Sequence, residues 1–168
     1  FMDWMYKQPH PSKLLISGHH DMTLDPVTND LLRKRRNSLP ADLSTKCRSL
    51  AVHNPEVEYL EDSSTIVKFP SSSSSCSSII SGSSMSSSSN SINDNINDIN
   101  VYGATWQPKF WGAFQLPSNI EQTQDIWAKI PSDTDILMTH GPPRTILDIV
   151  DGNNVGCNEL LKELTRVK

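Results

Sequence analysis

Two short apolar segments of the chain each run directly into histidine. Residues 13–17 lead into His19 and His20, and residues 135–139 lead into His140. Apolar runs that stop at a polar turn are typical of buried strands in an α/β sheet. In open α/β sheets the chemistry gathers at the carboxyl ends of the strands. We therefore assign both segments to one sheet and expect the histidines to converge on a site for a divalent metal.

The composition argues against several other classes of protein. A net charge of −4 is unfavourable for a nucleic-acid-binding surface, which needs an excess of Lys and Arg. Cys47, Cys76 and Cys157 are odd in number and far apart. They indicate neither a zinc finger nor a disulfide framework, and they fit a reducing, cytoplasmic compartment. No apolar run approaches the ~20 residues that span a bilayer, so we expect no membrane association.

The pattern along the chain predicts strands and helices around one low-complexity block. Strands are expected at residues 57–60, 65–69 and 100–106, and helices at residues 28–36, from a capping box at 118–121 to Pro131, and at 157–166. Residues 70–100 consist largely of Ser, Asn and Asp and should be disordered, because they bury too little apolar surface. We interpret them as an insertion into the loop of a hairpin, which costs little in loop closure. Roughly 130 residues remain, enough for one core.

Several motifs, taken in order, resemble one protein family. Residues 18–21 (GHHD) resemble the Gly-Asn-His-Asp/Glu motif of calcineurin-like metallophosphoesterases, and residues 139–143 (THGPP) resemble their next metal-binding motif. Segments that look like the metallophosphoesterase domain-containing subfamily lie at residues 101–103, 106–108, 135–143 and 155–161. The resemblance covers most of the chain except the insertion and parts of residues 26–56. As an ordered set, these motifs are specific.

The resemblance implies a two-layer mixed β-sandwich flanked by helices, with two divalent metal ions (Mn, Fe or Zn) between strand ends. It implies hydrolysis of a small-molecule phosphodiester, with 2′,3′-cyclic nucleotides as the substrate class. His140 falls on a metal ligand. His20 falls on the imidazole that contacts the phosphate and protonates the leaving oxygen. His19 falls where the family has a metal-binding Asn, so it is either a metal or substrate contact or a drifted position.

The resemblance also indicates a fragment. The opening Asp-x-His and Gly-Asp motifs of the family would lie upstream of Phe1, and its closing Gly-His-x-His would lie beyond Lys168. We therefore expect residues 1–168 to be a partial metallophosphoesterase domain, interrupted at residues 70–100 and inactive alone. The alternative is a truncated or degenerate member without catalysis, which acts as a partial fold or an interaction module.

Two sets of side chains near the histidines keep open roles. Asp21 is expected to support its loop by hydrogen bonding rather than to bind metal. Trp106, Trp111 and Phe114 either line a wall on which a nucleobase stacks or pack in the core.

Overall fold

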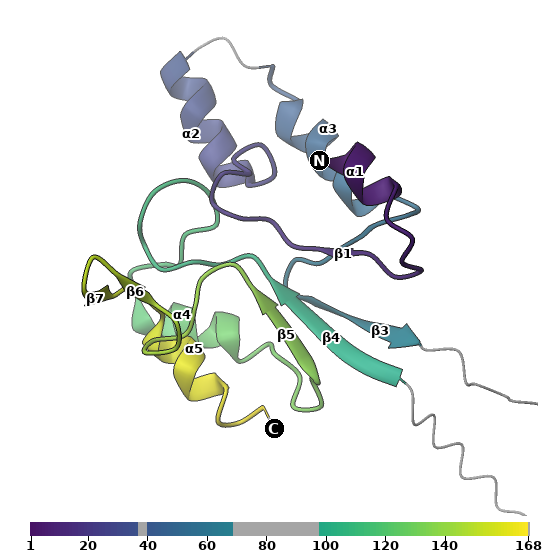
Figure 1. Cartoon of the computed structure of the whole chain (residues 1–168). Coiled ribbons are helices and arrows are strands. Elements are labelled where there is room, and N and C mark those ends of the chain that lie inside the picture. The colour runs from purple at the N-terminus through teal and green to yellow at the C-terminus, as the bar shows by residue number, and fades with distance from the viewer. Residues whose placement is uncertain (37–39, 69–97, 168) are drawn as a thin grey trace, which may run out of the picture.

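The computed structural model describes residues 1–36, 40–68 and 98–167. Within these ranges the elements are α1 (Met2–Tyr6), β1 (Leu14–Leu15), α2 (Pro26–Arg36), α3 (Leu43–Val52), β2 (Glu58–Tyr59), β3 (Ser63–Lys68), β4 (Asp98–Ala104), α4 (Ile120–Trp127), β5 (Ile136–Thr139), β6 (Ile149–Val150), β7 (Asn153–Asn154) and α5 (Asn158–Glu163). The protein is therefore mixed α/β, as the sequence predicts (Figure 1).

The described strands form three small sheets. β3, β4 and β5 lie side by side in that order, with β3 antiparallel and β5 parallel to β4. β1 pairs with β2 in a separate parallel ladder, and β6 and β7 form a hairpin. The expectation that the strands before His19 and His140 share one sheet is therefore wrong. Apolar periodicity marks each strand, but it does not say which neighbour completes the strand's hydrogen bonds.

The main core lies between the three-stranded sheet and helices α4 and α5. Tyr102 and Ala104 of β4 pack in one cluster with Trp127 of α4 and Leu160 of α5, and all four are at most 2% exposed. A large aliphatic side chain contributes about 1.5–3 kcal/mol when it is fully buried. This layer therefore anchors β4 and, through it, β5.

The opposite face of β4 meets the β1–β2 ladder through a glycine. A Cβ on Gly103 would lie 2.3 Å from Cβ of Leu60 and 2.9 Å from Cγ2 of Ile16. A larger residue would push the ladder away from the sheet. In Figure 1, α1, α2 and α3 lie on the β1 side, whereas α4 and α5 lie on the other side. The two β layers flanked by helices agree with the partial sandwich that the resemblance implies.

The hairpin expected around the low-complexity block is present. β3 and β4 pair from Ser63↔Gly103 to Lys68↔Asp98. β4 begins two residues before its predicted start, so residues 98–100 are strand. Residues 69–97 lie outside the described part of the chain, and the disorder predicted for them stays a prediction.

The predicted helix starts differ from the observed ones by one or two residues. α4 begins after Asn119, whose side chain accepts hydrogen bonds from the backbone N–H groups of Glu121 and Gln122. The predicted capping box, with Ser118 as the cap, is therefore displaced by one position. α2 begins at Pro26, where Asp25 accepts from the N–H of Val27, so the cap is not Thr28 or Asn29.

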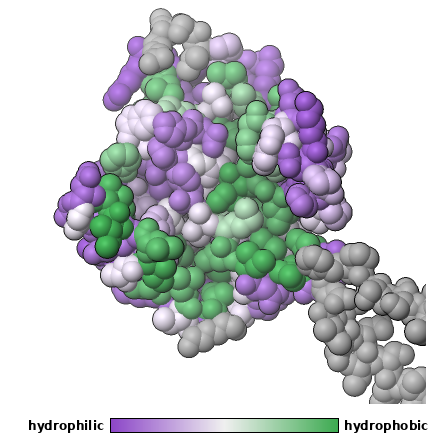
Figure 2. Space-filling view, viewed as in Figure 1, coloured by the Kyte–Doolittle hydropathy of each residue, from purple (hydrophilic) through white to green (hydrophobic). Residues whose placement is uncertain are grey.

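Hydrophobic side chains also reach the surface. Figure 2 shows them gathered over the central part of the face in view, in the region of the sheet. Ile136 of β5 is 47% exposed and Ile66 of β3 is 54% exposed. Contiguous apolar surface is typical of interaction surfaces. Among the helices of the described ranges, none has the length and apolar character to cross a bilayer.

Candidate active site

The segments that follow β1 and β5 bring two imidazoles into direct contact. Nδ1 of His19 lies 2.7 Å from Nε2 of His140, although the residues are 121 positions apart. The backbone N–H of His19 also donates to Nε2 of His140, at 3.2 Å. Gly18 permits this approach, because a Cβ there would lie 2.6 Å from Cε1 of the His140 ring. The segments of His19 and His140 therefore meet, between strand ends of two sheets rather than of the one sheet expected from the sequence.

The hydrogen bonds determine which ring nitrogen carries a proton. A backbone N–H can only donate, so Nε2 of His140 must be the acceptor. The proton between the rings then belongs to Nδ1 of His19. His140 consequently carries its proton on Nδ1 and presents a lone pair at Nε2.

His20 and Asp21 complete the loop after β1. The His20 side chain is exposed, and its ring centroid lies 4.3 Å from that of His19. Asp21 accepts a hydrogen bond from the N–H of Gly18, at 2.7 Å. This bond closes the loop on itself, which is the supporting role expected of Asp21.

The surroundings of His140 favour its neutral form. Partial burial of the imidazole lowers the pKa below the ordinary value of 6.5, and the nearby His19 and His20 lower it further, against the opposing effect of Asp21. A neutral imidazole keeps the lone pair that a metal ion or a proton donor requires. In the structure this lone pair, at Nε2, accepts from His19.

The described residues fit a divalent metal ion only in part. Two imidazoles on one tetrahedral ion, with bonds of about 2.0–2.1 Å, place their nitrogens roughly 3.3 Å apart. The 2.7 Å between Nδ1 of His19 and Nε2 of His140 is a hydrogen-bond distance. Within residues 1–36, 40–68 and 98–167, no three side chains of His, Cys, Asp or Glu are grouped to hold a metal. These residues do not make a complete metal site by themselves.

The three candidate aromatic residues have different environments. Trp106 packs against the main core, and its Nε1 donates to Asp62 at 2.8 Å. Phe114 is buried, with 4% of its surface exposed. Trp111 is 52% exposed, and its ring centroid lies 5.2 Å from that of His20. Core packing therefore accounts for Trp106 and Phe114, whereas Trp111 stays a candidate for the wall of a ligand site.

Sequence reasoning missed a polar network behind the histidine loop. Tyr59 donates to Glu61 at 2.8 Å, so the hydroxyl of Ser17, also 2.8 Å away, must donate to Tyr59. Arg48 donates to both carboxylate oxygens of Glu61, at 2.9 and 3.1 Å, and to the carbonyl of Leu24, at 2.6 Å. The network therefore ties down both flanks of the loop. Arg48 lies on α3, which the sequence pattern did not predict, so no local signal revealed it.

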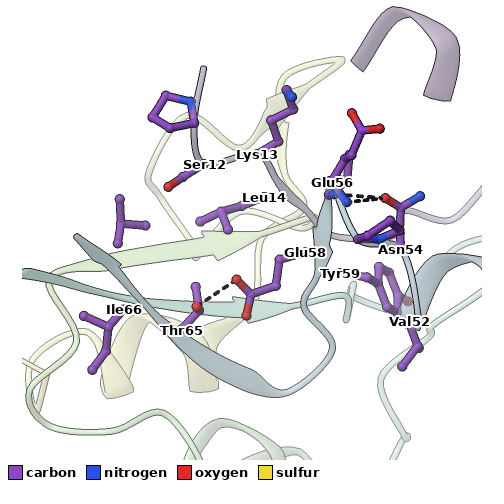
Figure 3. A pocket seen from close by; sticks show the side chains of 14 residues that line it. Ser12, Lys13, Leu14, Val52, Asn54, Glu56, Glu58, Tyr59, Thr65 and Ile66 are labelled. Carbon is purple, nitrogen blue, oxygen red and sulfur yellow. Dashed lines mark hydrogen bonds between the residues drawn. The ribbon is translucent and has the colours of Figure 1, made fainter. Parts of the chain in front are cut away.

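A separate cavity of about 470 Å³ lies beside β1, β2 and β3 (Figure 3). Thr65 of β3 donates to Glu58 of β2 across it, at 2.8 Å. Lys13 and Glu56 add a charge of each sign to its lining. None of the histidines predicted for the site lines this cavity, so it is not part of the candidate active site.

Comparison with known proteins bears on this arrangement. No protein-family model matches the chain. The chain is 29% identical, over 99% of its length, to the human metallophosphoesterase domain-containing protein 1, of which it covers 44%. The resemblance predicted from the motifs is confirmed. The chain is also 31% identical over 92% of its length to a UPF0046 protein of Caenorhabditis elegans, and 28% identical over 96% to an Emericella nidulans protein named "Probable rhamnogalacturonate lyase C".

These relatives are all longer than the matched region. The chain spans less than half of the human metallophosphoesterase domain-containing protein, 35% of the nematode protein and 11% of the fungal one. The similarity to the human protein extends over nearly the whole chain, which includes the segments of His19, His20 and His140. The roles of these three residues remain predictions.

Proposed function

We propose that this chain is part of a metal-dependent phosphodiesterase whose reaction centre includes His19, His20 and His140. The observation that carries the proposal is the contact between His19 and His140, at 2.7 Å, with His20 beside them. Similarity to a protein named for a metallophosphoesterase domain supports the same class of reaction.

Each histidine has a distinct role in the proposal. In the proposal His140 is a metal ligand through Nε2, which requires its hydrogen bonds from His19 to break, and His19 is a second ligand once Nδ1 has lost its proton. His20 is exposed and holds the phosphate or protonates the leaving oxygen. Two divalent metal ions, Mn, Fe or Zn, would supply a nucleophilic hydroxide near neutral pH.

The proposed substrate is a small phosphodiester, with 2′,3′-cyclic nucleotides as the class. An exposed imidazole next to an exposed Trp111 offers a proton donor beside an aromatic surface. The proposed compartment is the cytoplasm, where a reducing environment keeps Cys47 and Cys157 as the free thiols observed.

We further propose that the 168-residue chain is a fragment. Catalytic zinc sites have three protein ligands, and in the part of the chain that the structure describes only the two imidazoles of His19 and His140 converge. The same observation favours the alternative, in which the chain is a degenerate, non-catalytic member that keeps the fold. The two readings differ in whether the flanking reading frame restores the missing motifs.

Hydrolysis of bis(p-nitrophenyl) phosphate with added Mn²⁺ tests the proposal. We would compare the 168-residue chain with a version extended at both ends along its reading frame. The extended protein should turn over, whereas the 168-residue chain should be almost inactive. Robust turnover by the short chain that is lost in His140→Ala would contradict the expectation that residues 1–168 are inactive alone. No turnover by the extended protein would favour the non-catalytic reading.

Two substitutions in the extended protein separate the histidine roles. His140→Ala should weaken Mn²⁺ binding in calorimetry, because it removes a ligand. His20→Ala should slow turnover while Mn²⁺ stays bound, because it removes a proton donor. His53→Ala is the matched control, since that imidazole bonds to the carbonyl of Ser49 at the end of α3. Full activity in His20→Ala would contradict its role.

A further inference from the structure

A cavity lies between α1, α3 and strand β1. It encloses about 740 Å³, within the range of about 300–1,000 Å³ that is typical of small-molecule sites. Figure 1 shows α1 beside α3, on the side of the molecule where β1 lies. Most of the side chains that line the cavity are apolar, and they include Leu15, Ile16, Leu24, Leu50 and Ala51. The three histidines of the candidate active site are not among the lining residues.

Hydrogen bonds hold one wall of the cavity in place. The side-chain amide of Asn54 donates to the hydroxyl of Tyr6 at 2.7 Å, which joins the end of α1 to the segment after α3. The side-chain oxygen of Asn54 accepts from the N–H groups of Glu56 and Val57, at 2.9 and 3.0 Å. Both Tyr6 and Asn54 line the cavity. The fold itself therefore holds α1 at the cavity.

The charged side chains of the lining are all acidic. They are Asp3 of α1 and Asp21 of the loop after β1, and both are exposed, so they lie where the cavity opens to solvent. Among the described residues, neither carboxylate forms a salt bridge. Carboxylates without a cationic partner attract a cation and repel an anion. The rings of Phe1 and Tyr6 also line the cavity, and aromatic faces attract ammonium groups as well.

We propose that this cavity binds an amphiphile that joins a hydrocarbon tail to a positively charged amine. The tail lies against the apolar walls, where it leaves water, and the ammonium group lies at Asp3 and Asp21. A fatty acid with the same tail is disfavoured, because its carboxylate would meet two others. The inference goes beyond the proposed function and is independent of it, since none of the histidines lines the cavity.

The thiol of Cys47 offers a direct measure of occupancy. Cys47 is a free, partly exposed cysteine of α3 that lines the cavity. Its alkylation by iodoacetamide should therefore slow when a ligand fills the cavity, and peptide mass spectrometry assigns the reaction to this residue. Cys157 is the internal control, because its thiol is buried outside the cavity. Faster alkylation of Cys157 would reveal unfolding by the amphiphile.

Three probes with the same ten-carbon tail separate the tail from the head: decylammonium, decanol and decanoate. On the 168-residue chain, below the micelle concentrations, decylammonium should protect Cys47 at about tenfold lower concentration than decanoate, because the carboxylates attract one head and repel the other. Asp3→Asn should weaken protection by decylammonium about threefold, since Asp21 remains, and leave protection by decanol unchanged. Asp151→Asn, in the turn between β6 and β7, is the matched control, because that carboxylate is also exposed. It should respond like the unsubstituted chain.

Four results would overturn the proposal. Absent protection of Cys47 by all three probes would show that the tail does not enter the cavity. Protection by decanoate that equals or exceeds that by decylammonium, or an unchanged response in Asp3→Asn, would show that the carboxylates do not select the head. In the chain extended at both ends, a Cys47 that is unreactive without any amphiphile would show that the protein itself fills the cavity. None of these measurements uses turnover, so they are separate from a failure of the proposed function. Asp3 is exposed, so its variant should fold normally, and circular dichroism would verify this.

Discussion

Asp148 is a buried carboxylate that organises the loop after the second histidine segment. It is 2% exposed, and it accepts hydrogen bonds from the side chain of Asn154, at 2.6 Å, and from the N–H of Gly156, at 2.9 Å. Burial alone would raise its pKa, but these bonds and one from the backbone of Thr145 hold the pKa of Asp148 below its ordinary value of 3.8. The charged form is therefore the one that the fold stabilises.

We expect Asp148→Asn to lower the thermal midpoint at pH 7, because an amide has one acceptor oxygen, whereas Asp148 accepts through both of its oxygens. A carboxyl pKa that is depressed by folding contributes stability above pH 3.8, and this contribution is lost as the pH falls through the folded value. The difference between the two proteins should therefore shrink below pH 3.8. Thermal unfolding at pH 7 and at pH 3 measures it.

The exposed Asp151 supplies a control in the same loop. Asp151→Asn should have little effect at either pH, because asparagine also tolerates the φ of +49° found there. An equal loss in Asp151→Asn and Asp148→Asn would show that the buried acceptor is not the cause.

Arg48 gives a second prediction for a single residue. Arg48→Ala should lower the free energy of unfolding by about 2 kcal/mol, between the values for exposed and buried pairs, because it leaves Glu61 without its bidentate partner. Arg48→Lys should recover only part of this loss, since an ammonium cannot match both oxygens. Urea unfolding measures all three proteins.

The exposed pair of Lys46 with Asp42 is a matched control on the same helix. Lys46→Ala should change the free energy of unfolding by less than about 0.5 kcal/mol, as is usual at the surface. If Arg48→Ala costs no more than Lys46→Ala, the network does not anchor the histidine loop.

Among the elements, α4 allows a test of which residue caps its N-terminus. Asn119 accepts two backbone hydrogen bonds at the start of the helix. Asn119→Ala should therefore cost about 1 kcal/mol in the free energy of unfolding, the usual effect of losing an N-cap. Ser118→Ala should cost less than about 0.5 kcal/mol. If chemical denaturation shows a larger loss for Ser118→Ala than for Asn119→Ala, Ser118 is the cap.

Most elements could be predicted because their signals are local. β3, β4 and α4 follow from alternating apolar residues, from 3.6-residue periodicity and from Pro131 after the helix. α3 could not be predicted in this way, because Ser, Thr, Lys and Arg interrupt its apolar positions and its apolar stripe is weak. Its place depends on tertiary contacts such as that between Arg48 and Glu61, which no local pattern contains.

For the whole molecule, we expect the fold to tolerate replacement of the low-complexity block. β4 begins at Asp98, so the segment to replace is residues 70–97 rather than 70–100. A Gly-Asn turn in its place should leave the thermal midpoint nearly unchanged, because β3 and β4 already pair up to Lys68↔Asp98. Scanning calorimetry of both proteins measures this. A large fall in the midpoint, or a failure to fold, would show that the block packs against the domain.

The candidate site shows where sequence reasoning over the whole chain stops. A meeting of the loops after β1 and β5 was predictable, because polar residues follow two apolar strands. The separation of the two strands into different sheets was not predictable. β1 pairs with β2, and this ladder contacts β4 through the face that carries Gly103. The candidate role of Trp111 likewise depends on which side chains stay exposed. Trp106, Trp111 and Phe114 look alike in the sequence, and only their burial separates them.

The tight fit of Gly18 against His140 constrains how these two positions can evolve. A Cβ at position 18 would lie 2.6 Å from Cε1 and 2.8 Å from Nδ1 of the imidazole, so even alanine would displace the ring. A lineage that acquires a side chain at position 18 loses the contact between His19 and His140 in the same step. Once the contact is lost, it no longer constrains which residue occupies position 140. Among descendants of this sequence, positions 18 and 140 should therefore change together or stay unchanged together.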